Sequence, residues 1–490
     1  MARLSNSRAR ASRRRALALA AALIVLAAPA SAAAPPVSWY SIVTGAGAHV
    51  GYIRVEVRQT GDGLERTEQQ EVTVREQDAR ATRLSQRTTL RQDRAGRALS
   101  LTTETRTGAS VTRTEARPRP GGVEVMRETP AGRTRVILAA GPDVQFDGGE
   151  ALLARWDPAA GSRLEFEAFN PDTAAVERIV VSVLPGAAPA GGLTLLRAAY
   201  DGAELRGVSR LSLDAGRRVT AVTQPMFGTT ISVLPTDEAT ALRPRAPLRL
   251  MTTLMTKAPF RIPAGAIEGH IRYRFGFRDG LRFDLPQTGE QRVRLVDGAA
   301  VVDVCAACGP GLPSDAAALA AARAPTAWLQ SDDPRIRAVV APIAALKVSD
   351  ARKMEMLTDK ARGYIGEIDF AGHYSAAEIM QRRRGDCTEA AVLVAAFGRA
   401  AGIPTRTASG WVYSRERYHG VSNVFMPHSW AMAYVDGRWV SYDAALPRVG
   451  ATHIAVTIGD GDLRSMAASG QLASLLTWEA MTEVRRRPAS

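Results

Sequence analysis

The sequence has few lysines and no apolar run long enough to cross a membrane. Only four of its 63 basic residues are lysines, and the arginines are spread along the whole chain. An even spread does not build a basic groove, so we expect no nucleic-acid partner. The longest apolar run has about 13 residues, whereas a spanning helix needs roughly 20. We therefore expect no transmembrane span in the mature chain.

Residues 1–32 have the composition of a cleavable export signal. Six arginines precede or flank the apolar run "ALALAAALIVLAA", which Ala30-Ser31-Ala32 follows. No cysteine follows this site, which argues against a lipid anchor there. Loss of the six arginines lowers the formal charge from +14 to +8. We expect a periplasmic or secreted protein, with loose attraction to an anionic envelope polymer as one option for a partner.

Residues 33–250 predict a β-rich N-terminal domain. In "GYIRVEV", Ile53, Val55 and Val57 alternate with larger polar or aromatic residues, as a half-buried strand requires. Five further segments repeat this pattern, and 214–216 form a turn signal between two of them. This half contains one histidine and no cysteine. We expect a mostly antiparallel sheet, curved or folded into a sandwich, with a structural or recognition role.

The period changes to helical beyond residue 309. Residues 251–309 predict a strand-rich connecting segment that ends at a cysteine pair, and 310–460 predict helices followed by strands. Ser314 is expected to cap the first helix, and Pro334 fits the start of the next. Residues 461–490 predict a C-terminal helix or strand extension. The fold class is therefore a multidomain chain whose second half is an α+β core, with helices packed on an antiparallel sheet.

The three cysteines leave one thiol over if two of them pair. Cys305 and Cys308 are close enough in "VCAACG" for a local disulfide, which we expect in an oxidising compartment. A redox pair would sit at a strand-to-helix junction, which this sequence does not predict. A four-ligand zinc site needs a second ligand pair at suitable spacing, and none follows, so we expect no metal. Cys387 then remains free.

Cys387 has three readings: core filler, half of a disulfide, or a nucleophile. It follows Gly385-Asp386 and precedes "TEAAVLVAAFGRAAG", which predicts a helix that is apolar on nearly every side and ends at Gly402. A cysteine in the first helical turn lies at the positive end of the helix dipole, which favours a thiolate. Buried free cysteines are common, so this position alone does not decide among the readings.

A downstream hairpin supplies a base and an acid for this thiol. In "AYVDGRWV", Asp436-Gly437 is a favoured two-residue turn. With that turn as the loop, Val435 faces Arg438, and His428 lies diagonal to Asp443 on the same face, with alpha carbons roughly 7–8 Å apart. An imidazole and a carboxylate can meet across that distance. The register thus predicts a His428-Asp443 pair without any assumption about function. The sequence gives no such relation to an acid for His373, His419 and His453, which we expect to be surface or structural.

At these residues the sequence resembles the transglutaminase-like superfamily in its exported bacterial form. The matching pieces are "RRRGDCTEAAVLVAAFGRAAGIPTRTASGWVY" and "PHSWAMAYVDGRWVSYDAALP", in the family's order of Cys, His and Asp. The resemblance implies a papain-like α+β core with Cys387 as nucleophile, His428 as base and Asp443 as orienting acid. Many relatives have histidine where this chain has Ala390, which puts a secondary contact in doubt.

The resemblance implies an exported acyl-transfer enzyme that needs no cofactor and cleaves carboxamide or peptide bonds in a protein or peptide substrate. Hydrolysis is favoured over amine cross-linking because no acceptor site is apparent. Gln381 is a candidate for oxyanion support, against a solvated helix end. Trp411 is a candidate wall of the acyl site, against a place in the core. The contrasting hypothesis is a non-catalytic scaffold or binding protein of the cell envelope.

Overall fold

The structure is a computed structural model, and it describes residues 37–75, 82–107, 110–129, 132–159, 161–185, 191–226, 229–248, 255–258, 261–368, 374–415 and 421–484. The expected export signal lies outside these residues, as do His373 and His419, which the sequence indicates are surface or structural. Within the described ranges, no helix has the length and apolar character that crossing a membrane requires.

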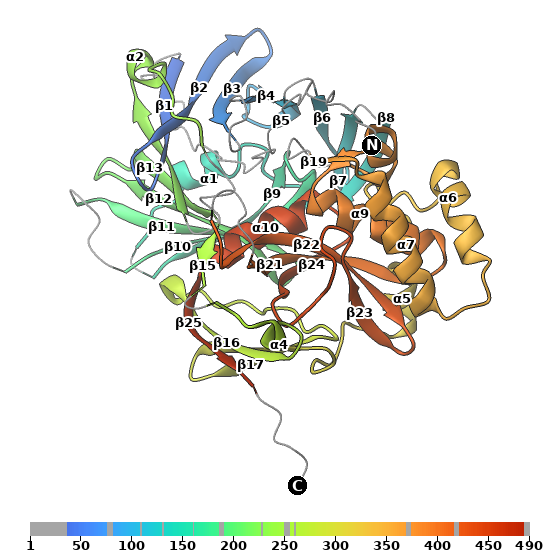
Figure 1. The fold of residues 1–490 in the computed structure, drawn as a ribbon. Coiled ribbons are helices and arrows are strands. Elements are labelled where there is room, and N and C mark those ends of the chain that lie inside the picture. Colours follow the sequence, from blue (N-terminus) through green and yellow to red (C-terminus); the bar gives the residue numbers. More distant parts are fainter. Residues whose placement is uncertain are drawn as a thin grey trace, which may run out of the picture.

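The N-terminal half forms one antiparallel sheet of fourteen strands in the order β8-β7-β6-β5-β4-β3-β2-β1-β14-β13-β12-β11-β10-β9. Figure 1 shows these strands, blue to green, curving across the upper part of the molecule. The strands are β1 (Val37–Thr44), β2 (His49–Thr60), β3 (Gly63–Val74), β4 (Thr82–Asp93), β5 (Ala98–Thr107), β6 (Ser110–Arg119), β7 (Gly122–Thr129), β8 (Gly132–Ala139), β9 (Arg163–Asn170), β10 (Ala175–Val183), β11 (Leu193–Asp201), β12 (Glu204–Leu213), β13 (Val219–Met226) and β14 (Thr229–Thr236). Two short helices, α1 (Glu150–Arg155) and α2 (Glu238–Ala241), lie in its connections.

Alternation along each strand explains why this sheet curls. Ile53 and Val55 of β2 are fully or almost fully buried, as predicted, and they share one apolar cluster with Ile179 and Val181 of β10. Since β2 and β10 are far apart in the strand order, the sheet bends until both contribute to the same core. Residues 214–218 form the predicted turn between β12 and β13. The single curled sheet replaces the alternative of a sandwich.

A second, four-stranded sheet has the order β17-β18-β16-β25. The C-terminal strand β25 therefore pairs with β16, about two hundred residues earlier in the chain, and residues 461–484 are integrated into the fold. This sheet is built from β16 (His270–Phe277), β17 (Gln291–Val296), β18 (Ala299–Cys305) and β25 (Leu476–Glu483), and the helix α4 (Ala264–Ile267) and the 3-10 turn η2 (Arg278–Gly280) flank β16.

The C-terminal core is α+β, as predicted. Its main sheet runs β15-β22-β21-β24, with β23 paired to β22, and a short parallel pair joins β19 to β20. The strands are β15 (Thr256–Lys257), β19 (Glu367–Ile368), β20 (Arg384–Gly385), β21 (Thr405–Ser414), β22 (Val424–Val435), β23 (Arg438–Tyr442) and β24 (Ile454–Gly459). The helices are α5 (Ala316–Ala321), α6 (Pro334–Ala344), α7 (Asp350–Tyr364), α8 (Ala376–Arg382), α9 (Cys387–Ala400) and α10 (Leu463–Ser474).

Of the two predicted helix-start signals, Pro334 is confirmed and Ser314 is wrong. Pro334 is the first residue of α6 and Ser349 caps α7. The cap of α5 is Asp315 and not the expected Ser314, because the Asp315 carboxylate accepts the Ala318 N–H. Either residue type can cap a helix, and the chain uses the one closer to the alanine run.

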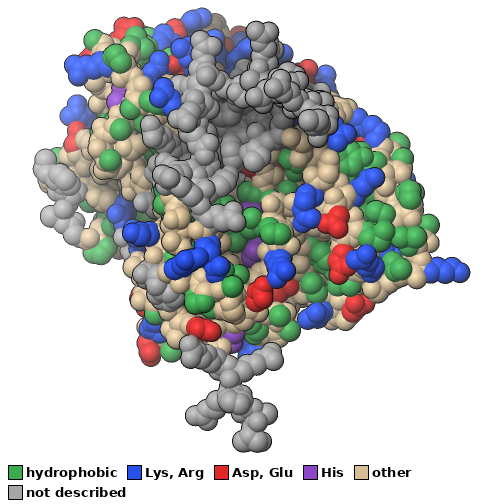
Figure 2. Space-filling model, in the orientation of Figure 1, with side chains coloured by type: hydrophobic (Ala, Val, Ile, Leu, Met, Phe, Trp, Pro, Cys, Tyr) green, Lys and Arg blue, Asp and Glu red, His purple; other side chains and the backbone are tan. Residues whose placement is uncertain are grey.

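Charged side chains are mixed over the surface. On the described residues of the face in Figure 2, Lys and Arg side chains alternate with Asp and Glu and form no continuous basic stripe. Many of these arginines pair with a carboxylate on the same or the next strand, such as Arg113 with Glu104 and Arg178 with Glu165. Many of the arginines on the sheet are thus paired with neighbouring carboxylates.

Candidate active site

Cys387 is the first residue of α9, at the end of the helix where backbone N–H groups lack helical partners. Asp386 caps the helix, since its carboxylate accepts the Thr388 N–H at 2.7 Å. The Glu389 carboxylate accepts the Asp386 N–H in return at 2.9 Å, which completes a capping box. Cys387 itself is half-buried. The predicted helix start is confirmed, and it leaves the thiol accessible at a helix N-terminus.

Glu389 fixes the loop that precedes the thiol. Its side chain is fully buried and also accepts the Tyr374 N–H at 3.3 Å. Burial and the neighbouring Asp386 carboxyl raise its pKa well above the ordinary value. Gly385 is required here because a Cβ would stand 2.4 Å from the Glu389 Cβ. Sterics at Gly385 and the hydrogen bonds of Asp386 and Glu389 therefore explain why the residues around Cys387 are Gly-Asp-Cys-Thr-Glu.

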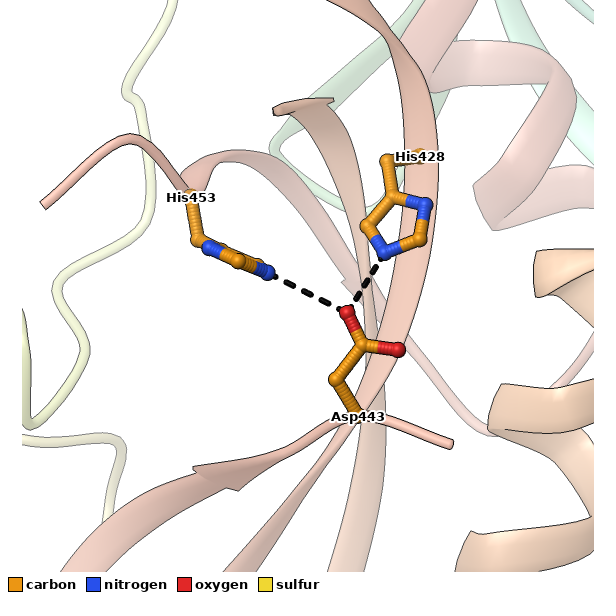
Figure 3. A group of neighbouring side chains, drawn as sticks. All are labelled: His428, Asp443 and His453. Carbon is orange, nitrogen blue, oxygen red and sulfur yellow. Dashed lines mark hydrogen bonds and ion pairs between the residues drawn. The ribbon is translucent and has the colours of Figure 1, made fainter. Parts of the chain in front are cut away.

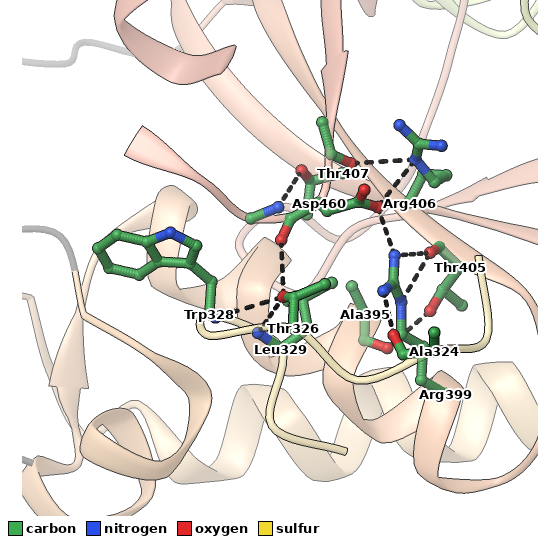
Figure 4. Close-up of polar contacts among 12 residues, drawn as sticks. Ala324, Thr326, Trp328, Leu329, Ala395, Arg399, Thr405, Arg406, Thr407 and Asp460 are labelled. Atoms are coloured by element: carbon green, nitrogen blue, oxygen red, sulfur yellow. Dashed lines mark hydrogen bonds and ion pairs between the residues drawn. The ribbon is translucent and has the colours of Figure 1, made fainter. Parts of the chain in front are cut away.

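The opposite end of α9 is fixed by a buried arginine, shown in Figure 4. Arg399 donates to the carbonyl oxygens of Thr405 and Ala324 and forms an ion pair with Asp460. The Thr405 hydroxyl donates to the Ala395 carbonyl of the same helix. These contacts join α9 to β21 and to the loop after β24, so the helix that carries Cys387 is held at both ends.

The hairpin of β22 and β23 has the predicted register. Val435 faces Arg438, and the ladder continues outward to Ala431 and Tyr442. Asp436 and Gly437 both have positive φ, as the two-residue turn requires. Beyond the last ladder pair, His428 Nε2 and Asp443 Oδ2 are 2.7 Å apart. Figure 3 shows this contact, and both side chains are almost completely buried.

The charges around His428 favour its protonated form. Burial opposes protonation, but the Asp443 carboxylate and then the Cys387 sulfur outweigh burial and raise the pKa of His428 to about 10. For Asp443, burial acts upward, yet the two histidines and their hydrogen bonds hold its pKa well below the usual range. Nδ1 of His428 is buried, and besides Asp443 the group that interacts with this imidazole is the Cys387 side chain. Because Nε2 is used by Asp443, Nδ1 is the atom available for proton transfer.

Asp443 is held from both sides of its carboxylate. Oδ1 accepts the backbone N–H groups of Ala445 and Leu446 at 2.8 and 2.9 Å, while Oδ2 faces the histidines. Arg362 from α7 donates to the carbonyl oxygens of Asp443 and Ala444. The acid is therefore rigidly placed, which a group that orients an imidazole needs.

His453 is a member of this site that the sequence did not predict. It is buried just before β24, and its Nε2 lies 3.2 Å from Asp443 Oδ2. The Gly450 N–H donates to Nδ1 at 3.2 Å, so the proton must be on Nε2, which donates to the carboxylate. Burial lowers the pKa of His453, in keeping with a neutral ring. The sequence indicated a surface or structural histidine, and the structure instead gives it direct contact with Asp443.

The three side chains in Figure 3 are also the ones that could approach a metal ion, since their ligand atoms lie within 4.8 Å of one another. Both imidazoles, however, already point Nε2 at the same carboxylate oxygen. That geometry satisfies the groups by hydrogen bonding alone. It suits an oriented His-Asp pair better than a tetrahedral zinc site, which would place the ion between separated ligands.

Gln381 and Trp411 are the two further site candidates that the sequence offered. Gln381 is exposed on α8, and the hydrogen bonds of the described residues include none from it to Cys387 or His428. Trp411 is buried in β21, with ring centroids 5.8 Å from Phe275 and 5.3 Å from Trp478. This is the core position that was the alternative for Trp411.

Trp430 is the aromatic residue beside the site. Its ring stacks on His428 at 6.1 Å and meets His453 edge-on at 5.2 Å. The indole N–H donates to Ser441, which is itself bonded to Glu290. Trp430 is two residues after His428 in β22, so the alternation of a strand predicts that both side chains lie on the same face. That alternation is the sequence signal for their contact.

The expected disulfide is not formed, because Cys305 and Cys308 are both free thiols. Cys305 ends β18, and the Cys308 thiol turns to the carbonyl oxygens of Glu290 and Asp303 at 3.2 and 3.5 Å. Burial, followed by the nearby Cys305, raises the pKa of Cys308 to about 12. A thiol is oxidised through its thiolate, so this environment disfavours pairing.

A thiol at a helix N-terminus that packs on a sheet bearing a His-Asp pair is the arrangement of papain-like, cysteine-dependent enzymes. Helix α9 lies against β22 and β21, so the two halves of the site are on adjoining elements. Residues 337–444 match the family model of the transglutaminase-like superfamily, and this chain therefore contains a transglutaminase-like core. The match covers Cys387, His428 and Asp443.

Two solved structures similar to this chain each cover less than half of it. A β-barrel-like protein from Brucella abortus, with a domain of unknown function, is 14% identical and covers 41% of this chain and 95% of its own, with a TM-score of 0.33. A candidate cysteine protease from Cytophaga hutchinsonii is 15% identical and covers 45% and 84%, with a TM-score of 0.27. Such scores do not establish a shared fold. No curated protein matches the sequence.

Proposed function

We propose that the protein is an exported cysteine-dependent acyl-transfer enzyme that acts on carboxamide or peptide bonds. The observation that carries the proposal is the 2.7 Å contact between His428 Nε2 and Asp443 Oδ2, together with the interaction of the Cys387 side chain with the same imidazole. The half-buried Cys387 at the start of α9 is the proposed nucleophile. The export signal that the sequence predicts at residues 1–32 supports a periplasmic or secreted location.

The proposed reaction proceeds through a thioester. The Cys387 sulfur attacks the carbonyl carbon, and the C–N bond breaks as His428 donates its Nδ1 proton to the leaving amine. Water then attacks the thioester while the neutral imidazole takes a proton from it. The carboxylic acid leaves, and the thiolate and imidazolium are restored. Asp443 stabilises the imidazolium and keeps its Nδ1 turned to the reacting groups.

Hydrolysis is the favoured outcome over amine cross-linking. Water can reach a thioester at the half-buried Cys387 without a binding site, whereas an acceptor amine would need a recognition site of its own. A protein or peptide is the proposed substrate, and an envelope polymer is a further option. Gln381 is proposed as oxyanion support only if α8 moves its exposed amide toward the thiol.

Hydroxylamine provides a test that does not need the natural acceptor. The purified protein would be incubated with a mixture of glutamine-containing peptides and hydroxylamine, which converts a thioester into a hydroxamate and frees the thiol. We expect peptide hydroxamates with the wild type and with C305S/C308S, and none with C387A. Equal hydroxamate yields from wild type and C387A would contradict the proposal.

A further inference from the structure

A polar cavity lies between the N-terminal sheet and α10. It is open to solvent and comprises about 680 Å³ of space when the open solvent at its mouth is counted, and side chains of β10 to β13 and α10 line it. Figure 1 shows α10 beside the sheet, and this helix contacts β12 and β13 on one side and β24 on the other. None of Cys387, His428, Asp443 or His453 lines this cavity.

Three arginines in this cavity have donors without acceptors. Arg197 is only 9% exposed, and its Nε has no hydrogen-bond partner in the described structure. The same is true of Nε of Arg206 and of Nε and Nη2 of Arg464. Nη2 of Arg206 pairs with the exposed Glu204 and with Asp201, and Nη1 of Arg464 pairs with Asp201, which is partly exposed. A buried guanidinium without acceptors is costly, so these donors require a partner.

The carboxyl groups in the cavity do not supply that partner. Glu177 is buried, and its Oε1 already accepts from Asn170 and Thr173. The nearest Arg464 nitrogen stands 4.0 Å from that oxygen. Asp172 accepts from Gln86 with one oxygen, and burial raises its pKa to about 6. These two carboxyl groups, together with Asp201 and Glu204, leave four guanidinium nitrogens without a hydrogen bond in the described structure, which are Nε of Arg197, Arg206 and Arg464 and Nη2 of Arg464.

We propose that this cavity binds a small molecule through an oxyanion, either a carboxylate or a phosphate, held by Arg197, Arg206 and Arg464. Planar guanidinium groups recognise both anions by paired hydrogen bonds. The unpartnered Oδ2 of Asp172 would accept an N–H or O–H of the same ligand. Since the walls come from the N-terminal sheet and from α10, the ligand would join the two halves of the chain. This proposal is independent of the acyl-transfer proposal.

Calorimetric titration and thermal denaturation of the full, extensively dialysed protein test it. The probes are inorganic phosphate, the dipeptide Ala-Ala and the C-terminal amide of Ala-Ala. We expect saturable heat and a raised Tm with phosphate or with Ala-Ala but not with its amide. Phosphate alone would assign the site to phosphates, and Ala-Ala alone would assign it to carboxylates. No saturable heat from either anion at millimolar concentration would overturn the proposal.

Substitution separates binding from folding. R197M should weaken binding by roughly tenfold or more, as expected for one lost charge-assisted hydrogen bond. R218M is the matched control, because Arg218 is exposed on the neighbouring hairpin and pairs only with Asp214. Without ligand, R197M should melt at or above the wild-type temperature, since it removes a buried unpaired charge. Wild-type affinity in R197M, or a Tm well below that of wild type, would contradict the assignment.

Discussion

Replacement of His453 tests whether the second histidine orients the proposed catalytic acid. His453→Leu removes the 3.2 Å donor to Asp443 Oδ2 and leaves the carboxylate with His428 and two backbone N–H groups. A hydrogen bond to an ionised group contributes about 1.5–3 kcal/mol. Because three other donors remain, we take the lower end, about 1.5 kcal/mol, which corresponds to a roughly tenfold loss in rate.

The assay is the rate at which iodoacetamide alkylates Cys387 at neutral pH, followed by peptide mass mapping. This rate follows the thiolate that the His-Asp pair sustains and requires no substrate. His453→Gln is the matched control, because its amide N–H can donate to the same oxygen and should recover part of the rate. Thermal denaturation checks that both variants fold. If His453→Leu folds and Cys387 is alkylated at the wild-type rate, the positioning role is wrong.

Three further predictions concern the His428-Asp443 pair, the loop at Gly385 and the Arg399 end of α9. The pKa of His428 rises on folding from 6.5 to about 10, so its ion pair with Asp443 stabilises the fold fully below pH 6.5 and less as pH rises toward 10. The unfolding free energy of wild type minus that of D443N, measured by urea titration, should shrink over this range, and a constant difference would contradict it. Gly385→Ala should lower the free energy of unfolding by about 1–3 kcal/mol and slow the alkylation of Cys387, because the added Cβ would clash with Glu389. An unchanged alkylation rate together with an unchanged midpoint of the urea titration would argue against a tightly packed loop. Arg399→Met should lower the free energy of unfolding by about 3 kcal/mol, because it leaves buried carbonyl groups without a donor, and Cys387 should remain the alkylated residue. A calorimetric Tm equal to that of wild type would count against a stabilising role for the Arg399 hydrogen bonds.

Local signals were enough to predict much of the site. The two-residue turn at Asp436-Gly437 fixes the register of β22 and β23, and period-two alternation then puts His428 on the face of Asp443. The capping residues of α9 are adjacent in sequence, so its start at Cys387 is a local property too. These features depend on interactions within about fifteen residues, which pattern analysis can reach.

Features that depend on distant pairing could not be predicted in this way. His453 reaches Asp443 only because β24 pairs with β21, on the other side of β21 from β22. A histidine just before an apolar strand and ten residues after the acid was the available signal. The joining of fourteen strands into one curled sheet, and the contact of α10 with β12, likewise arise from tertiary packing. The Cys305 and Cys308 thiols show that close spacing alone does not produce a disulfide.

The most direct test of the central claim is the mass of the Cys387 peptide after reaction with peptide amides and a rapid acid quench. If Cys387 is the nucleophile, this peptide gains the mass of an acyl group as a thioester, which hydroxylamine removes. The peptide that contains Cys305 and Cys308 should remain unmodified, and H428Q should abolish the adduct. No adduct on Cys387, together with equal alkylation of all three cysteines in the native protein, would contradict an activated thiol at this site.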